Sequence, residues 1–156
     1  MSKQHHYSLH LEWTGNLGKG TSSYRAYSRD HKLMGEGKPP LLVSSDPAFR
    51  GNPERYNPEE LLVSSLSSCH MLWYLHFCAV GGIHVNSYVD HPEGWMEELP
   101  QGQGQFTKVL LQPRVHISSD SDYDLALELH SKAHSYCFIA RSVNFPVEHL
   151  ASISVD

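Results

Sequence analysis

A long run of hydrophobic residues at helical spacing occupies residues 58–80. Asn57 precedes it as a typical N-cap, Pro58 suits the first helical position, and two glutamates follow in the first turn. The pair Gly81-Gly82 is a typical helix end. The pattern therefore predicts a helix of about six turns that begins near Pro58 and ends near Val80.

A second helical pattern begins after the acidic segment at residues 119–122. Apolar residues recur there at helical spacing, and Asn144-Phe145-Pro146 ends the region. The residues that mark the expected buried side are Leu125, Leu129, Ala133 and Cys137.

The remaining chain carries the shorter period of strands. Residues 7–13 alternate between apolar and polar side chains, a turn rich in glycine follows, and residues 21–29 read as the returning strand of a hairpin. Further strands are expected at residues 41–44, 83–91, 106–118 and 147–155. The order β-β-β-α-β-β-α-β predicts an α+β fold, with a sheet packed on two helices in one domain over residues 1–156.

Composition and charge exclude several classes of protein. The net charge is −5, from 12 Lys and Arg against 17 Asp and Glu, which argues against a nucleic-acid partner. The start of the chain is not an apolar secretory segment, and no apolar run reaches membrane-spanning length. A reducing cytoplasmic location is therefore expected. A phosphate-binding glycine motif is absent, and nothing in the chain implies a metal, flavin or haem cofactor.

Cysteines are few, and their positions favour thiol chemistry over a disulfide scaffold. Of the three, Cys69 and Cys137 fall on the apolar sides of the two predicted helices. Cys78 lies nine residues after Cys69, which rotates it about half a turn away, so we expect it to be a packed core residue. The Cys69 face of the helix is expected to carry Leu62, Ser65, Leu66, Trp73 and His76.

Three segments together resemble the OsmC/Ohr family, the osmotically inducible and organic-hydroperoxide-resistance proteins. These are Asn57-Pro58-Glu59-Glu60-Leu61-Leu62, Cys69, and Ala133-His134-Ser135-Tyr136-Cys137. The resemblance covers nearly the whole chain and implies an OsmC-like fold. It also implies an intertwined homodimer with two active sites at the subunit interface, and thiol-dependent reduction of organic hydroperoxides.

The resemblance further implies a role for individual residues. Cys69 matches the family's peroxidatic position and Cys137 its resolving position, so the sulfenic acid formed on Cys69 would become a Cys69–Cys137 disulfide. An external dithiol, in the family often a lipoylated protein, would then reduce it. Glu59 matches a carboxylate that organises the thiolate together with an arginine. Arg50 is favoured as that arginine, with Arg25 and Arg29 as alternatives.

Helix geometry adds an expectation about Glu59. It lies ten residues before Cys69 on the same predicted helix, so about 15 Å of helix axis separates the two backbones. A glutamate side chain does not span that distance. If Glu59 acts on Cys69, it must belong to the partner subunit. The alternative is that Glu59 only interacts favourably with the helix dipole.

Other assignments remain open at this stage. Cys69, His70, His134 and Cys137 offer the sulfur and nitrogen ligands of a structural zinc site, although their spacing argues against it. His70 and His134 otherwise read as neighbours of the thiols. Trp73, Tyr74 and Phe77 suit either an apolar pocket or ordinary core packing. The chain could also be an OsmC-like protein that binds a small ligand without peroxidase activity.

Overall fold

The computed structural model describes residues 1–156 as two compact units, residues 1–61 and residues 62–156. Helix α1 (Pro58–Val80) begins in the first unit and runs through the second. The expectation of one domain over the whole chain stays a prediction.

The N-terminal unit contains a small antiparallel sheet. Its strands β1 (His10–Trp13), β2 (His31–Met34) and β3 (Leu41–Val43) pair in that order, and a short 3₁₀ helix, η1 (Pro47–Phe49), follows. The returning strand expected at residues 21–29 is wrong, because that segment forms turns and the strand begins at His31. The Arg29 guanidinium donates hydrogen bonds to the carbonyls of Tyr24 and Tyr27, both at 2.7 Å, which hold this segment in a loop.

Helix α1 starts where the sequence predicts. The Asn57 side-chain oxygen accepts a hydrogen bond from the Glu60 N–H at 2.9 Å, and the Asn57 amide donates to the Glu60 carboxylate at 2.7 Å. This reciprocal cap satisfies donors that the first turn leaves free. The helix ends before Gly81-Gly82, and Gly82 has a φ of 73°, which favours glycine.

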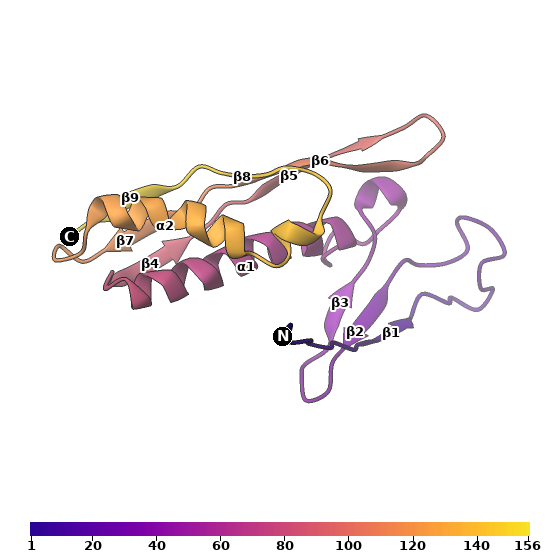
Figure 1. Cartoon of the computed structure of the whole chain (residues 1–156). Coiled ribbons are helices and arrows are strands. Elements are labelled where there is room, and N and C mark those ends of the chain that lie inside the picture. Colours follow the sequence, from indigo (N-terminus) through magenta and orange to yellow (C-terminus); the bar gives the residue numbers. More distant parts are fainter. The chain divides into compact units, whose positions relative to one another are not determined.

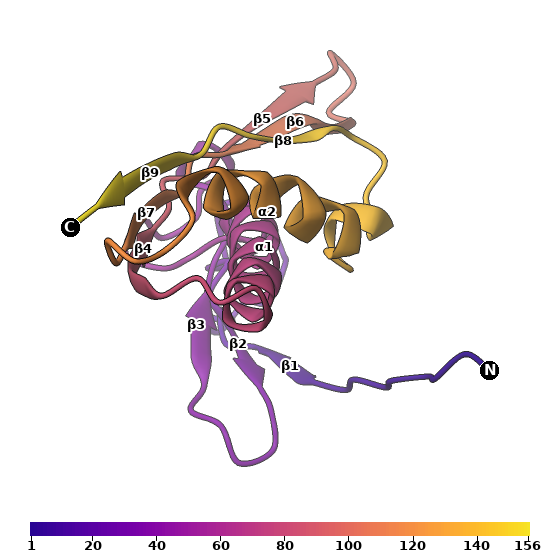
Figure 2. The ribbon, with the colours of Figure 1, turned by 60° about the vertical axis from the view of Figure 1, so that its left-hand side comes forward.

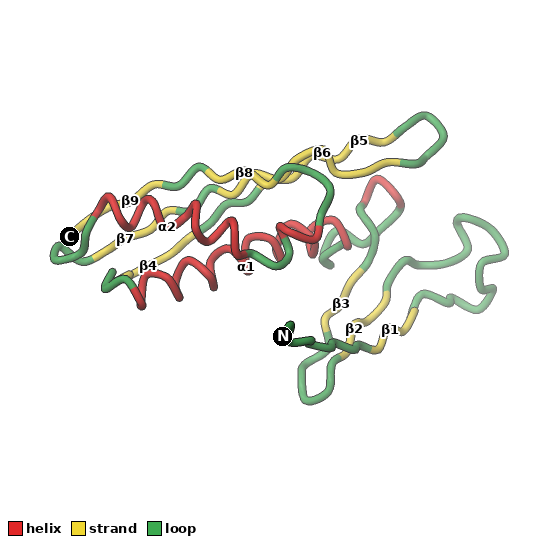
Figure 3. The backbone as a smooth tube through the Cα atoms, in the orientation of Figure 1, coloured by secondary structure: helices red, strands yellow, loops and turns green.

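Six strands of the C-terminal unit form two three-stranded sheets, shown in Figure 3. One has the order β4-β7-β9 and the other the order β5-β6-β8. Their bounds are Val85–Val89 for β4, Glu93–Glu98 for β5, Gly104–Leu111 for β6, Arg114–Ile117 for β7, Val147–His149 for β8 and Ser152–Val155 for β9.

Two of the three strands predicted in this unit, residues 147–155 and 106–118, are each divided in two, with breaks at Leu150-Ala151 and at Gln112-Pro113. The predicted strand at residues 83–91 contains β4 alone, and β5 lies after it, where no strand was predicted. At the second break Pro113 has no N–H to donate, and the Gln112 N–H donates to the Asp90 carboxylate at 2.7 Å instead of to a strand. The protein therefore has nine strands where the pattern predicts six, although the α+β class is confirmed.

Both helices of the C-terminal unit lie side by side on one face of strands β4–β9 (Figures 1 and 2). Helix α2 (Tyr123–Tyr136) is capped by Asp122, whose carboxylate accepts from the Leu125 N–H at 3.0 Å. It ends earlier than predicted, because Cys137 is its C-cap and a separate 3₁₀ helix, η2 (Ala140–Ser142), follows. No helix of the protein is long and apolar enough to cross a membrane.

Two clusters of buried side chains form the core of this unit. The larger one joins α1, α2 and the β4-β7-β9 sheet through Tyr74, Phe77, Cys78, Ile83, Val115, Ile117, Ala126, Leu129 and Ala133. The smaller one joins the middle of α1 to the β5-β6-β8 sheet through Leu66, Val109, Leu111 and Val147. Removal of this apolar surface from water fixes α1 on the sheets and so fixes the direction in which Cys69 points.

Candidate active site

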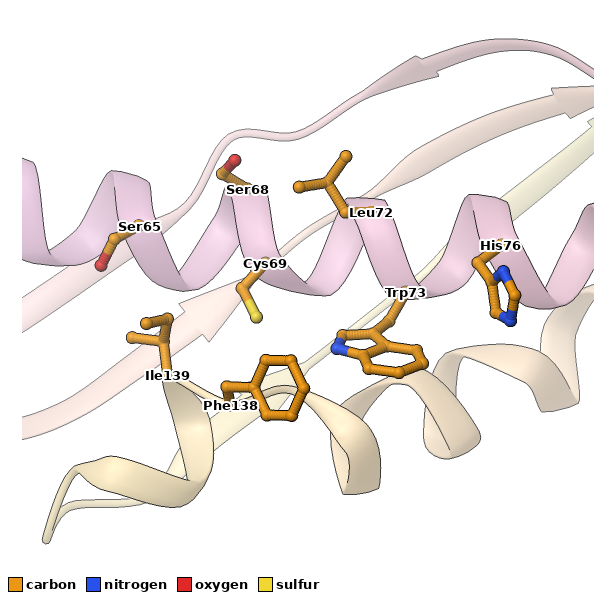
Figure 4. Close-up of a pocket in the computed structure, with 8 residues that line it drawn as sticks. All are labelled: Ser65, Ser68, Cys69, Leu72, Trp73, His76, Phe138 and Ile139. Carbon is orange, nitrogen blue, oxygen red and sulfur yellow. The ribbon is translucent and has the colours of Figure 1, made fainter. Parts of the chain in front are cut away.

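Cys69 lines a pocket of about 570 Å³ between α1 and the segment that follows α2. The pocket is mostly apolar, and Figure 4 shows the Cys69 sulfur pointing from α1 towards Phe138 and Ile139. The thiol is half-buried and is not in a disulfide. The lining residues are Ser65, Ser68, Cys69, Leu72, Trp73, His76, Phe138 and Ile139.

Helical spacing predicted part of this lining. Ser65, Trp73 and His76 line the pocket with Cys69 as expected. Two of the expected residues do not line it: Leu62 is half-buried outside the lining, and Leu66 is fully buried in the smaller core cluster. Four lining residues were not predicted: Ser68 and Leu72 on α1, together with Phe138 and Ile139. The position of the last two directly after Cys137 is the signal that could have indicated them.

Cys137 is brought next to Cys69 from the end of α2. Its side chain is 1% exposed, its thiol interacts with that of Cys69, and the Ala140 N–H donates to its sulfur at 3.4 Å. The pKa of the Cys137 thiol is raised to about 11, mainly by burial and in addition by the interaction with Cys69, while the Ala140 N–H acts in the opposite direction. Cys137 therefore remains a protonated thiol at neutral pH and can donate its S–H to the Cys69 sulfur.

Cys78 lies away from both other thiols, as predicted. It is 1% exposed in the larger core cluster, where burial raises the pKa of its thiol. Its partner there is Tyr74, whose hydroxyl donates to the Ala126 carbonyl at 2.9 Å. The interpretation of Cys78 as a packed core residue is confirmed.

The aromatic residues after Cys69 divide between the pocket and the core. Trp73 faces the pocket, and its ring lies 5.5 Å from the ring of Phe138 and 5.3 Å from that of Tyr136, measured between centroids. Tyr74 and Phe77 are buried in the larger core cluster. The pocket interpretation is therefore correct for Trp73, and the core-packing interpretation is correct for Tyr74 and Phe77.

The alternative zinc site is not assembled. His70 is buried on another side of α1, where its Nε2 atom lies 3.0 Å from Nδ1 of His130 rather than beside the thiols. The ring of His134 packs near His149 at 5.8 Å. Nowhere in the protein do three His, Cys, Asp or Glu side chains converge as a metal site. The structure therefore does not bring Cys69, His70, His134 and Cys137 together as a set of ligands.

Glu59 and the candidate arginines all belong to the N-terminal unit. Glu59 is half-buried in the first turn of α1, so about 15 Å of helix separates it from Cys69 of its own chain. Arg50 is exposed at the C-cap of η1 with a φ of 64°, and its guanidinium makes no hydrogen bond or ion pair. The Arg29 guanidinium is already occupied by two carbonyls and by two tyrosine rings, at 4.4 and 4.0 Å.

Similar proteins share this fold and arrangement of the chain. Residues 51–149 match the OsmC-like protein family. An OsmC-like protein of unknown function from Vibrio cholerae is 31% identical, with a TM-score of 0.86 over 96% of this chain and 100% of its own. The uncharacterised protein YmaD of Bacillus subtilis is 25% identical over 97% of this chain and 95% of its own.

A more distant structure has a name that bears on chemistry. An organic hydroperoxide resistance protein from Elizabethkingia anophelis has a TM-score of 0.68 over 99% of this chain and 100% of its own. Its sequence is 17% identical, so this likeness concerns the fold alone.

Proposed function

The chain belongs to the OsmC-like protein family, and from this membership we propose that it is a thiol-dependent peroxidase that reduces organic hydroperoxides to alcohols. The observation that carries the proposal is the pair of free thiols at an apolar pocket. Cys69 is accessible there, and Cys137 interacts with it from a buried position. The fold shared with an organic hydroperoxide resistance protein supports the same conclusion.

In the first step of the proposed reaction, the Cys69 thiolate attacks the terminal oxygen of the hydroperoxide. The O–O bond breaks, the alkoxide takes up a proton and leaves as an alcohol, and Cys69 becomes a sulfenic acid. Leu72, Trp73, Phe138 and Ile139 offer the organic part of the substrate an apolar surface next to the attacked oxygen.

In the second step, the Cys137 sulfur attacks the sulfenic sulfur of Cys69. The S–S bond forms and water leaves, which gives a Cys69–Cys137 disulfide. The contact between the two thiols means that the step needs little movement of the chain. An external dithiol, for which a lipoylated protein is a candidate, then reduces the disulfide by two exchanges and becomes oxidised itself.

The raised pKa of Cys137 suits its resolving role. A thiol that stays protonated at neutral pH does not compete with Cys69 for the peroxide, because the thiolate is the nucleophile. Its S–H can stabilise negative charge on the Cys69 sulfur by donating to it. The difference in burial thus supports an attacking role for Cys69 and a resolving role for Cys137.

We further propose that Glu59 of the partner subunit completes the site in a homodimer. Exposed apolar side chains on and beside the N-terminal sheet support dimer formation, since Leu11 of β1 is 60% exposed and Leu9, just before β1, is 68% exposed. A three-stranded sheet needs an apolar face covered to be stable, and a second copy of the chain would cover this one. The separation of Glu59 from Cys69 along α1 supports a contribution from the other chain.

Arg50 is the arginine that we propose beside the thiolate. Its guanidinium is not engaged by other polar groups, so it can bind a carboxylate and a peroxide oxygen without losing a contact. Arg29 would have to release two hydrogen bonds to do so. Arg25 is exposed and also stays a candidate.

The three free cysteines suit a reducing compartment, and we propose a cytoplasmic location on that ground.

A second candidate function is the binding of a small apolar ligand without turnover. The pocket of about 570 Å³ favours it, because apolar walls of this kind also fit a non-reacting ligand.

Steady-state reduction of cumene hydroperoxide with an excess dithiol separates the two functions. Cys69→Ser should lower the rate by about 10³-fold or more, because a serine hydroxyl is a much weaker nucleophile than a cysteine thiolate at neutral pH. Cys78→Ala is the matched control and should keep the rate within about twofold, since Cys78 lies in the core and away from the pocket. Equal rates for Cys69→Ser and the unmodified protein would rule out the peroxidase.

A further inference from the structure

Four histidines gather between α1, α2 and β8. His70 lies on α1, His130 and His134 lie on α2, and His149 ends β8. The His70 and His130 rings are nearly parallel with centroids 5.3 Å apart, His149 lies 5.5 Å from His70, and His134 lies 5.8 Å from His149. His70 and His130 are each 1% exposed, whereas the other two are half-buried. We call these four residues the histidine cluster.

The two buried rings share one hydrogen bond that suits neutral imidazoles. Nε2 of His70 lies 3.0 Å from Nδ1 of His130, so one ring donates and the other accepts. The outer nitrogens, Nδ1 of His70 and Nε2 of His130, are buried and have no hydrogen-bond partner. An added proton would either remove the acceptor of the shared bond or place an N–H where nothing accepts it. The pair therefore resists protonation for geometric reasons.

Burial and the neighbouring imidazoles also oppose protonation. The pKa of His70 is lowered to about 4, mainly by burial and in addition by repulsion from His149 and His134. Burial lowers the pKa of His130 to about 3, and repulsion from His70 and His149 adds to it. Burial and His134 also lower the pKa of His149.

No carboxylate compensates for a proton on the cluster. The titratable group that faces it from α1 is Tyr74, whose ring stacks on His130 at 3.8 Å and whose hydroxyl is bonded to a carbonyl. Tyr88 of β4 lies behind Tyr74 with ring centroids 5.9 Å apart. The ion pairs of the protein involve other residues, and none reaches the cluster.

The cluster also connects the two helices that carry the thiols. His70 directly follows Cys69 on α1, and His134 comes three residues before Cys137 at the end of α2. We propose that the histidine cluster is an acid-sensitive contact between α1 and α2, which keeps Cys137 against Cys69 only while its imidazoles are neutral. The proposal rests on the thiol pairing that underlies the proposed function, but it does not depend on any reaction with a peroxide.

The expected pH dependence has a definite sign. In the unfolded chain a histidine titrates near its ordinary pKa of about 6.5, whereas in the folded protein His70 and His130 do so near 4 and 3. The unfolded chain therefore binds more protons between these values. Stability is fully present above pH about 6.5 and is lost as the pH falls towards 4. With two such groups, the unfolding constant rises up to about a hundredfold per pH unit in that window.

Urea unfolding at several pH values and one protein concentration tests the thermodynamic part. The free energy of unfolding of the unmodified protein should fall between pH 6.5 and 4.5. The double variant His70→Phe/His130→Phe should lose most of this pH dependence, because phenylalanine keeps the stacked rings without a titrating group. His84→Gln is the control, since His84 is exposed beside Asp120 and outside the cluster. It should keep the full slope. The same slope in the double variant would overturn the proposal.

Histidine ring NMR of the unmodified protein provides a test that needs no variant. The His70 and His130 ring nitrogens should not titrate between pH 7.5 and 5.5. Titration of both buried rings near pH 6.5 would overturn the proposal even if the double variant failed to fold.

Thiol labelling with 4,4′-dithiodipyridine at pH 7 and pH 5, followed by peptide mapping, tests the link to the site. Cys137 and Cys78 are both buried, so their labelling ratio within one molecule cancels the reagent's own pH dependence. If the end of α2 that carries Cys137 separates from α1 while the core cluster around Cys78 stays packed, the ratio of Cys137 to Cys78 labelling should rise about tenfold or more at pH 5. An unchanged ratio would contradict a local release of Cys137.

Discussion

Two thiols in contact need not have the same role, and the difference between Cys69 and Cys137 comes from burial. Cys69 opens onto an apolar pocket, whereas Cys137 is enclosed at the C-cap of α2 and has a raised pKa. A protonated, enclosed thiol is poorly suited to attack a peroxide that arrives through the pocket. It is well placed to reach a sulfenic acid on Cys69.

Cys137→Ser should separate the two steps of the proposed reaction. The variant should reduce one equivalent of hydroperoxide at a rate close to that of the unmodified protein. Further peroxide should then convert the Cys69 sulfenic acid to sulfinic and sulfonic acids, because no second thiol reaches it. The intact mass should rise by two and then three oxygens, and peptide mapping should place them on the peptide that contains Cys69. Sustained turnover by this variant without over-oxidation would assign resolution to another thiol.

At this scale the sequence predicted the thiols well and the histidines less well. The spacing of Cys69 and Cys78 on α1 was enough to assign one to the pocket and one to the core. His70 was interpreted only as a neighbour of Cys69, and its pairing with His130 was not predicted. That pairing joins residues 60 positions apart, so no local pattern encodes it.

At the scale of elements, hydrogen bonds in the first turn of α1 stabilise Asn57-Pro58-Glu59-Glu60, part of the chain that resembles the OsmC/Ohr family. Asn57 and Glu60 exchange hydrogen bonds there, and Glu59 lies between them on the turn that they cap. The local exchange explains why the start of this helix could be predicted from four residues. It also fixes the position from which Glu59 would act in a dimer.

Asn57→Ala should remove this cap and lower the free energy of unfolding by about 1–2 kcal/mol, because an N–H of the first turn loses its acceptor. Urea unfolding monitored by circular dichroism measures the loss. Asn86→Ala is a suitable control, since that exposed side chain bonds only to Asp156, and its effect should stay within about 0.5 kcal/mol. Equal effects of the two substitutions would mean that the cap contributes nothing specific.

Strand boundaries could not be predicted in the same way. The pattern at residues 106–118 predicted one strand, yet the ladder breaks at Gln112-Pro113 and the chain continues as a second strand. Whether a proline ends a strand depends on what its neighbours pair with. Here the Asp90 carboxylate, 22 residues away, takes the Gln112 N–H. Helix α2 likewise ends at Tyr136, earlier than its pattern predicts, because the backbone of Cys137 is extended at the C-cap.

At the scale of the whole molecule, the proposed active site needs a second copy of the chain. The apolar face of the N-terminal sheet is exposed, and Glu59 is too far along α1 to reach Cys69 of its own chain. Both observations are explained if two chains associate and each contributes its N-terminal unit to the other chain. The dimer would then be necessary for chemistry as well as for stability.

Mixed dimers test this requirement directly. Glu59→Ala and Cys69→Ser should each be nearly inactive as homodimers. When they are unfolded together and refolded, about half of the dimers should be mixed if association is random. Each mixed dimer would contain one site with both Cys69 and the partner's Glu59. A mixture should therefore recover about a quarter of the activity of the unmodified protein. No recovery, with mixed dimers verified by mass, would place Glu59 in the same chain or outside the mechanism.

The most direct test of the central claim is the intact mass of the fully reduced protein after one equivalent of cumene hydroperoxide, followed by peptide mapping. The account predicts the loss of two hydrogens from the protein and a single cross-link between the peptides of Cys69 and Cys137, with Cys78 still a free thiol. Three unchanged thiols, or slow oxidation without preference among them, would contradict the peroxidase and favour a protein that only binds a ligand in this pocket.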